Sequence, residues 1–148
     1  MSQIFHFENC FSTNDEILSL LNEDEPTAVF TFNQTKGRGQ YGNIWKVIPN
    51  QNLAYSIAIK TSNIRISDTF LNYYTAIIVR DFLANLTNAS CKIKWPNDII
   101  LNGKKGCGIL IEKKKFENVE YYIIGIGINV LQTDFTNLPK AGSVLTAT

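Results

Sequence analysis

The spacing of apolar and polar residues predicts a chain with more strands than helices. Four stretches are rich in β-branched and aromatic residues or alternate between apolar and polar positions. They are residues 4–7, 27–32, 53–60 and 119–128, and this pattern is typical of strands. The last of them contains two glycines, and because glycine weakens a strand interior we expect the strand to be broken there.

The second half of the chain also predicts a hairpin. Residues 92–95 fit a short strand, and residues 99–101 and 108–112 are apolar runs on either side of Asn102-Gly103. An Asn-Gly pair between such runs is the usual signal for a tight type I′ turn. The tail, residues 131–148, has only a weak pattern.

Two helices complete the prediction. Ser12 and Thr13 can cap a short helix, with Asp15 and Glu16 placed for a capping box. A longer helix can begin after Ser67 and run to about residue 86, with apolar residues at helical spacing. The aromatic residues that we expect on its buried face are Phe70, Tyr74 and Phe82. Strands outnumber helices, so the predicted class is α+β with a mostly antiparallel sheet.

The composition supports a single globular domain and gives no global sign of a charged partner. The 148 residues are 45% hydrophobic and 18% charged, with a formal net charge of +1. We therefore expect no nucleic acid and no membrane among the partners. Three scattered cysteines, Cys10, Cys91 and Cys107, indicate free thiols rather than a disulfide frame or a zinc site. No secretory signal is evident at the start, and we expect a cytoplasmic location.

The loop at residues 34–46 is the first candidate for chemistry. Gly37 and Gly39 let the backbone approach a ligand and turn its N–H groups toward an anion. Arg38 adds a planar fork for phosphate or carboxylate oxygens, and Trp45 adds a flat apolar face. The same residues also fit an ordinary surface loop. The loop matches neither a Walker A motif nor a dinucleotide fingerprint.

Four further segments carry polar groups at the ends of predicted elements. Residues 94–98 (KWPND) place an amide and a carboxylate after a strand, where they can contact a ligand or metal or simply form a turn. Residues 104–112 begin with lysines that can meet a phosphate or stay solvated. The glycines of residues 124–130 allow close approach of a ligand or a second backbone, or mark a bulge. Residues 12–14 can hold a polar head group or cap the helix.

The order and the residue sequences of these segments resemble the successive motifs of the biotin–protein ligases, also called biotin–[acetyl-CoA-carboxylase] ligases. The motifs are STN, QTKGRGQYGNIW, KWPND, a lysine followed by GCGILIE, and GIGIN, and the similarity runs from about residue 4 to about residue 145. The resemblance implies a mixed, mostly antiparallel sheet flanked by helices, as in the catalytic fold that these ligases share with class II aminoacyl-tRNA synthetases.

The resemblance also implies an activity. Such a ligase uses ATP and Mg²⁺ to convert biotin to biotinyl-5′-AMP, and transfers the biotin to a lysine of a biotin carboxyl carrier protein or domain. One alternative is a lipoate– or octanoyl–protein ligase or transferase of the same fold, although the chain has no Arg-Arg-x-x-Gly-Gly-Gly stretch of the kind those proteins carry. Another is a fragment that binds biotin without catalysis. A homodimer is left open.

Residue roles follow from the resemblance, motif by motif. Lys105 and Arg38 match the catalytic residues, and Asp98 matches a position near magnesium. The residues implied to bind biotin are Ser12, Thr13, Asn14, Gln34, Gly37, Arg38, Gly39, Gln40, Lys105, Gly108 and Ile109. The residues implied to bind ATP are Arg38, Trp45, Lys94, Asn97, Lys105 and Asn129.

The chain departs from its relatives in two ways. Gln40 and Asn43 stand where many relatives carry arginine, so Arg38 is the loop's one arginine. Relatives also continue past this point, and some begin with a DNA-binding domain. We therefore expect residues 1–148 to be one catalytic domain that is incomplete at its C-terminus, with no DNA-binding domain and no C-terminal β-barrel domain.

Overall fold

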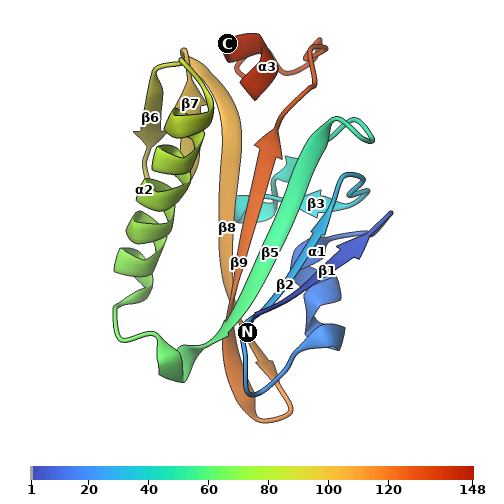
Figure 1. Cartoon of the computed structure of the whole chain (residues 1–148), viewed down its shortest axis with the longest axis vertical. Coiled ribbons are helices and arrows are strands. Elements are labelled where there is room, and N and C mark those ends of the chain that lie inside the picture. The colour runs from blue at the N-terminus through green and yellow to red at the C-terminus, as the bar shows by residue number, and fades with distance from the viewer. Residues whose placement is uncertain (1) are drawn as a thin grey trace.

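The structure, a computed structural model, describes residues 2–148. Its centre is a seven-stranded sheet with the order β1-β2-β5-β9-β8-β7-β6 (Figure 1). These strands are β1 (Gln3–Phe7), β2 (Thr27–Thr31), β5 (Asn52–Lys60), β6 (Cys91–Lys94), β7 (Asp98–Leu101), β8 (Lys104–Phe116) and β9 (Val119–Asn129). Two short strands, β3 (Gly37–Arg38) and β4 (Ile44–Trp45), pair with each other outside this sheet.

The pairing confirms the predicted class. β1 and β2 pair in parallel, and the neighbours from β2 to β6 pair antiparallel. Asn102 and Gly103 have φ of 47° and 83°, which a type I′ turn requires, and they join β7 to β8 as predicted. The predicted break in β9 is wrong. The strand continues through Gly125 and Gly127 because β5 and β8 pair with it on both sides.

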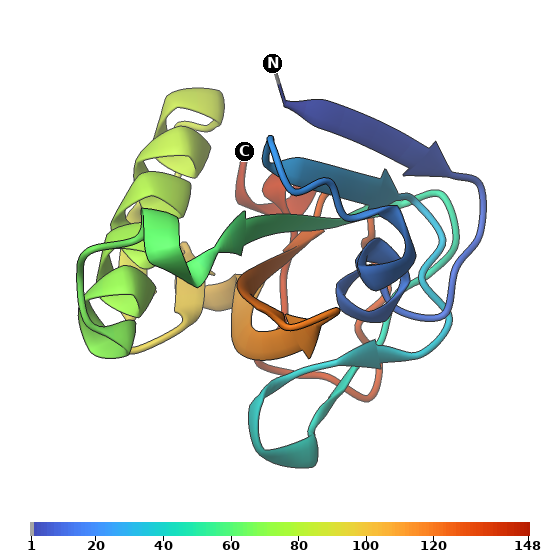
Figure 2. The same ribbon diagram turned by 90° about the horizontal axis from the view of Figure 1, so that it is seen from below.

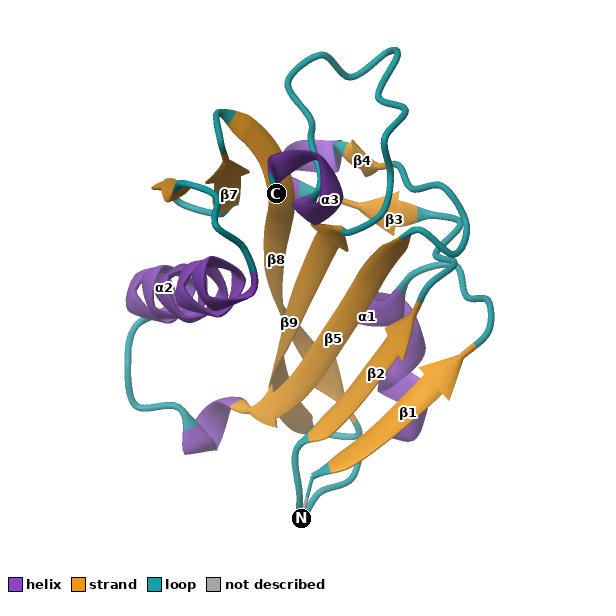
Figure 3. Cartoon of the chain, turned by 45° about the horizontal axis from the view of Figure 1, so that its top comes forward, coloured by secondary structure: helices purple, strands orange, loops and turns teal. Residues whose placement is uncertain are grey.

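Helices lie on both faces of the sheet, as Figures 2 and 3 show. The helical segments are α1 (Thr13–Glu16), η1 (Ile17–Leu20), η2 (Gln40–Gly42), η3 (Thr61–Asn63), α2 (Asp68–Leu86) and α3 (Val144–Ala147). α2 covers one face beside β6 and β7, and α1 with η1 covers the other. Within residues 2–148, no helix combines the length and the apolar character needed to cross a membrane.

Side chains on β9 alternate between these two layers. Tyr122 packs with Leu71 of α2 in one cluster. Ile123, its neighbour, packs with Ile17 of η1 in another. Because this alternation has a period of two, the next residues on the η1 face are the two glycines of the strand. The sheet is thus well packed at one end and has a nearly bare surface further along the same face.

The buried face of α2 differs from the one predicted. Ser67 caps the helix as expected, since its Oγ accepts a hydrogen bond from the backbone N–H of Phe70 at 3.3 Å. Phe70, Tyr74 and Phe82, however, are 65%, 60% and 54% exposed, so their assignment to the core is wrong. The residues that pack against the sheet are Leu71, Thr75, Ala76, Val79 and Leu83. This stripe includes smaller side chains, which let the helix lie close to the sheet.

Candidate active site

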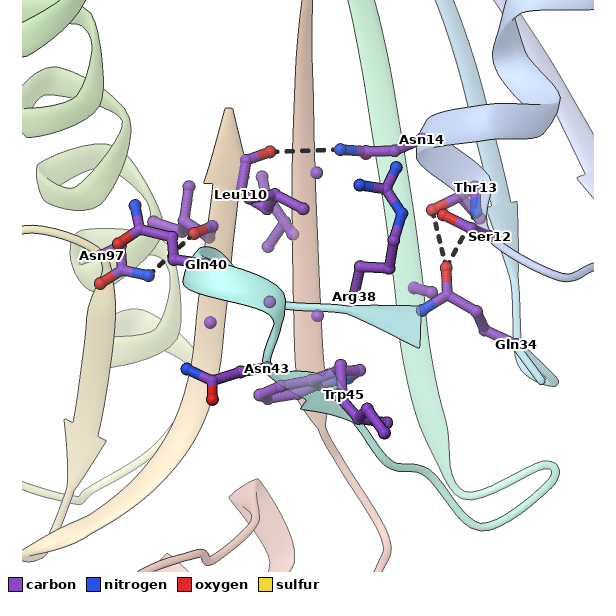
Figure 4. Close-up of a pocket in the computed structure, with 18 of the residues that line it drawn as sticks. Ser12, Thr13, Asn14, Gln34, Arg38, Gln40, Asn43, Trp45, Asn97 and Leu110 are labelled. Carbon is purple, nitrogen blue, oxygen red and sulfur yellow. Dashed lines mark hydrogen bonds between the residues drawn. The ribbon is translucent and has the colours of Figure 1, made fainter. Parts of the chain in front are cut away.

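A cavity lies on the α1 face of the sheet, between the start of α1, the loop that carries β3 and β4, and the strands beneath (Figure 4). The described residues that line it are Ser12, Thr13, Asn14, Gln34, Arg38, Gly39, Gln40, Asn43, Ile44, Trp45, Ala54, Asn97, Asp98, Lys105, Gly108, Ile109, Leu110, Gly125, Ile126 and Gly127. All five motifs of the sequence contribute to this list. Segments up to 115 positions apart, from Ser12 to Gly127, therefore meet at one place.

Glycines form the floor of the cavity. Gly108 of β8 lies opposite Gly127 of β9. A Cβ at Gly127 would lie 2.6 Å from the indole ring of Trp45, and a Cβ at Gly125 would overlap the side chain of Asn14. The sequence was compatible with a ligand or a second backbone close to these glycines, or with a bulge. The structure shows that two side chains of the chain itself, Trp45 and Asn14, take this space.

The STN motif does not cap its helix with side chains, so the predicted capping role is wrong. Ser12 occupies the N-cap position, but its side chain makes no capping hydrogen bond. Its carbonyl oxygen instead accepts hydrogen bonds from the backbone N–H groups of Asp15 and Glu16 at 3.1 and 2.9 Å. The polar side chains of residues 12–14 are buried and are left for contacts outside the helix.

Those contacts form a buried polar network at one end of the cavity. Ser56 Oγ lies 2.8 Å from Thr13 Oγ1 and 2.6 Å from Asn14 Oδ1. The Thr13 backbone N–H donates to Gln34 Oε1 at 2.9 Å, as Figure 4 shows beside the loop. Buried polar groups that bond to one another hold fixed orientations. This end of the cavity therefore presents a rigid set of hydroxyl and amide groups.

The other end carries a lysine. Lys105 Nζ lies 2.8 Å from Asp98 Oδ1 and 5.6 Å from the centre of a Trp45 ring. The ammonium group is thus held between a carboxylate and an aromatic face. Asn97 is fixed nearby, since its Nδ2 donates to the carbonyl oxygen of Ile109 at 3.1 Å. Lys105 is a positive charge of defined position at the cavity wall.

Arg38 is the second cation of the cavity, and carboxylates hold it. Its Nη1 and Nη2 donate to Glu112 Oε2 and Oε1 at 2.9 and 3.0 Å, and Nη2 also donates to Asp15 Oδ1 at 2.7 Å. The hydrogen bond to Glu112 raises the pKa of Arg38. Burial raises the pKa of Glu112, but the hydrogen bonds and charges of its neighbours outweigh burial and leave that pKa below its ordinary value. The loop is therefore tied to the sheet through one ion pair.

The structure brings most of the predicted site residues to this cavity and leaves three outside its lining. Gly37 packs closely against Gln34, since a Cβ at Gly37 would lie only 2.5 Å from Gln34 Nε2. Lys94 is exposed at the end of β6. Asn129 is buried at the end of β9, where its Nδ2 donates to the carbonyl oxygen of Gly142 at 3.0 Å. The ligand roles of these three residues, like those of the residues that line the cavity, stay predictions.

Several contributors were not predicted from the sequence. Ser56 and Glu112 connect to the motif residues through side-chain contacts, and Leu110 and Ile44 line the cavity. Two of them had a signal in the sequence. Ser56 is a polar residue within the otherwise largely apolar β5 segment, and Glu112 is a carboxylate that directly follows an apolar run in the β8 segment.

The described residues do not form a metal cage. Within residues 2–148 no group of three or more His, Cys, Asp or Glu side chains is placed to hold a metal ion. Asp98 is the one carboxylate residue among the described cavity-lining residues, and it is already paired with Lys105. Mg²⁺ is commonly held by one or two carboxylates together with substrate phosphates. Asp98 alone could therefore bind Mg²⁺ only if the phosphates of a nucleotide supplied further ligands.

The site thus combines, on a mixed sheet, a glycine-floored cavity, a rigid polar end, two cations and a covering loop. The model of the biotin/lipoate A/B protein ligase family matches residues 8–129. The chain belongs to this family.

Individual relatives agree with this membership. The chain is 33% identical over 137 residues to the biotin–[acetyl-CoA-carboxylase] ligase of Paracoccus denitrificans, covering 90% of this chain and 55% of that protein. It is 36% identical over 112 residues to the bifunctional ligase/repressor BirA of Bacillus subtilis, covering 75% and 34%. The solved structure of the biotin protein ligase from Aquifex aeolicus with biotin and ATP superposes with a TM-score of 0.82, at 25% identity, over 97% of this chain and 60% of that one. The chain thus spans about a third to a half of the length of these two curated relatives.

Proposed function

We propose that this chain contains the active site of a biotin–protein ligase, which activates biotin with ATP and transfers it to a lysine of a carrier protein. The observation that carries the proposal is the meeting of all five motifs around one cavity. Its polar end suits the neutral ureido group of biotin, and its cationic end suits a carboxylate and a phosphate. The relatives named above support the choice of biotin and ATP.

The polar network would bind the biotin ring. Ser12, Thr13 and Asn14 offer hydroxyl and amide groups that are already oriented, which lowers the entropic cost of binding. The rings would lie among these groups, with Gln34 at one side. The valerate chain of biotin would extend through the cavity toward Lys105.

The first chemical step would join two anions. A carboxylate oxygen of biotin attacks the α-phosphorus of Mg·ATP, a P–O bond forms, and pyrophosphate leaves with the electrons of the broken bond. Lys105 and Arg38 are the two cationic side chains among the described lining residues, and they would offset the repulsion and stabilise the charge that develops. Positioning of the two reactants supplies much of the remaining acceleration.

The second step would transfer the acyl group. The neutral amine of a carrier lysine attacks the carbonyl carbon of biotinyl-5′-AMP, a C–N bond forms, and AMP leaves as the C–O bond breaks, with the amine proton lost to solvent. The covering loop, with Trp45 across the floor, would keep water from the mixed anhydride until the carrier arrives. A biotin carboxyl carrier protein or domain is the proposed partner, the cytoplasm the proposed location, and Mg²⁺ the proposed companion of ATP.

Lipoate is the second candidate substrate, because the family includes lipoate ligases. Lipoate lacks a ureido group, so it could not replace the hydrogen bonds to water that the hydroxyl and amide groups of residues 12–14 would lose on binding, which is costly. A biotin-binding fragment without catalysis is a third reading. Competition binding of biotin against lipoate separates the first two, and ATP turnover separates the third.

The experiment that tests the proposal is pyrophosphate release from ATP by the 148-residue chain, with and without biotin and Mg²⁺. Release that needs both establishes the adenylation step. Release that lipoate supports and biotin does not would replace biotin with lipoate. Biotin affinity without release would assign the binding role alone.

A further inference from the structure

The carboxylate of Glu112 connects two parts of the cavity that are far apart in the sequence. Its Oε1 accepts a hydrogen bond from Asn14 Nδ2 at 3.0 Å. Both of its oxygens accept from Arg38, at 2.9 and 3.0 Å. Asn14 belongs to the polar end of the cavity, and Arg38 belongs to the covering loop. Glu112 itself comes from β8 in the sheet and does not line the cavity.

The contact with Asn14 sets the direction of an amide. The amide nitrogen faces Glu112 and, at 3.4 Å, the carbonyl oxygen of Leu110, and both of these groups only accept. A flipped amide would turn its oxygen toward two acceptors. The amide oxygen must therefore face the other way, toward Ser56, whose hydroxyl lies 2.6 Å from it. Glu112 thus determines which groups of Asn14 remain for a ligand.

The contact with Arg38 occupies the cation of the loop. A guanidinium and a carboxylate joined by two hydrogen bonds form one of the stronger side-chain pairs. Arg38 is 39% exposed at its side chain and Glu112 is 21% exposed, so water screens the pair only in part. An anionic ligand that needs Arg38 has to compete with Glu112 for it. Asp15 is a second, single-bonded partner on the outer side.

We propose that Glu112 is a positioning residue that orients Asn14 for its ligand and holds Arg38, with its loop, in the ligand-free arrangement. The proposal deepens the proposed function and rests on it for the identity of the ligand. Glu112 touches no reacting atom. It acts through Asn14 in the polar network and through Arg38 in the covering loop.

Asp15 supplies the matched control. Both Glu112→Gln and Asp15→Asn remove one negative charge beside Arg38. Glu112 also contacts Asn14, whereas the side chain of Asp15 makes its contacts with Arg38 and Lys114. A difference between the two variants in ligand affinity that exceeds their difference in loop opening therefore reports on Asn14, and an effect shared by both reports on Arg38.

The first measurement needs no ligand. Trypsin cleaves after arginine, so its initial rate of cutting at Arg38–Gly39, relative to the exposed Arg65–Ile66 bond, reports on how firmly Arg38 is held. We expect Glu112→Gln to raise this relative rate about fivefold, because the loop opens more often once the paired charge is lost. Asp15→Asn should raise it less. An unchanged rate in Glu112→Gln would overturn the holding role.

The second measurement is the Kd for biotin by calorimetry. Glu112→Gln should bind biotin about tenfold more weakly than Asp15→Asn does, because a charged acceptor of the Asn14 amide has become a neutral one. Equal Kd values would overturn the orienting role. If Glu112→Gln does not fold, Glu112→Asp keeps the charge but withdraws the carboxylate by one methylene, and the same order of effects is expected. A wild-type chain that binds no biotin would refute the proposed function, while the cleavage rates would still decide whether Glu112 holds Arg38.

Discussion

The sheet-side wall of the cavity and the loop over it, residues 37–45, are built in opposite ways. The wall consists of long paired strands and buried polar groups such as Ser56 and Asn14, which are 0% and 4% exposed. The loop has two strands of two residues each, and its Tyr41 and Ile44 are 97% and 71% exposed. Backbone pairing determines the wall, whereas a few side-chain contacts determine where the loop lies.

This difference separates two functions within one site. A wall made from paired strands keeps its groups in place before a ligand arrives, which favours selective binding. A loop held mainly by Trp45 and the ion pair of Arg38 can open and close at small cost. Changes in the wall should therefore abolish binding or chemistry, and changes in the loop should alter rates to a smaller extent.

The largest effect is expected at the cationic end of the wall. Lys105→Ala should lower biotin-dependent pyrophosphate release by about 1,000-fold, because a group that stabilises developing charge is lost. Biotin affinity should fall by less than about tenfold, since the ring contacts remain. Lys104→Ala is the control, because Lys104 is exposed and its Nζ contacts the carbonyl oxygen of Pro139 outside the cavity. Equal loss of binding and of release in Lys105→Ala would contradict its assignment to the chemical step.

A smaller but still large effect is expected on the floor. Gly125→Ala adds a Cβ where the Asn14 side chain lies, and Asn14 cannot move aside without losing its bonds to Ser56 and Glu112. Biotin affinity should fall about 100-fold, close to 2.7 kcal/mol. Ile124→Val is the control on the same strand, because Ile124 packs with Leu71 of α2 and does not line the cavity. Calorimetry measures both, and an affinity of Gly125→Ala within threefold of wild type would show that Asn14 is free to shift.

The loop itself should respond more weakly. Trp45→Ala removes the ring that lies over Gly127 and beside Lys105. We expect adenylation to slow about tenfold, because Lys105 loses an aromatic neighbour and the site loses its cover. More biotinyl-5′-AMP should also escape into solution, where chromatography can measure it. A loss as large as that of Lys105→Ala would mean that Trp45 is part of the wall and not of the cover.

The wall and the loop also differ in what the sequence could reveal. The five motifs identified the right segments because a polar group or glycine at an element end is visible locally. The connecting residues Ser56 and Glu112 were missed because their contacts cross from one strand to a distant helix: Asn14 and Glu112 are 98 positions apart. Only the pairing of β5 with β9 and of β9 with β8 brings them together.

The same limit explains the misassigned face of α2. The helix has apolar residues on two sides, one with Phe70 and Tyr74 and the other with Leu71 and Ala76. Periodicity detects both stripes but carries no information on which of them meets the sheet. Packing decides, and it favours the stripe whose smaller side chains allow close approach. The partners of Gly125 and Gly127 were likewise open, because a glycine shows that space is needed but not which group fills it.

The smallest effect is expected at the tip of the loop. It is the strictest test of the difference between the wall of the cavity and the loop that covers it. Tyr41 is 97% exposed, does not line the cavity and has φ of 57°. Tyr41→Ala keeps that backbone conformation at a similar cost and removes no buried contact, so the biotin Kd and the adenylation rate should change by less than about twofold. Steady-state kinetics on this variant, beside Trp45→Ala, measure how far the influence of the loop extends along it. A tenfold loss in Tyr41→Ala would show that the tip contacts a ligand in the closed state, and the loop would then take part in recognition instead of only covering the site.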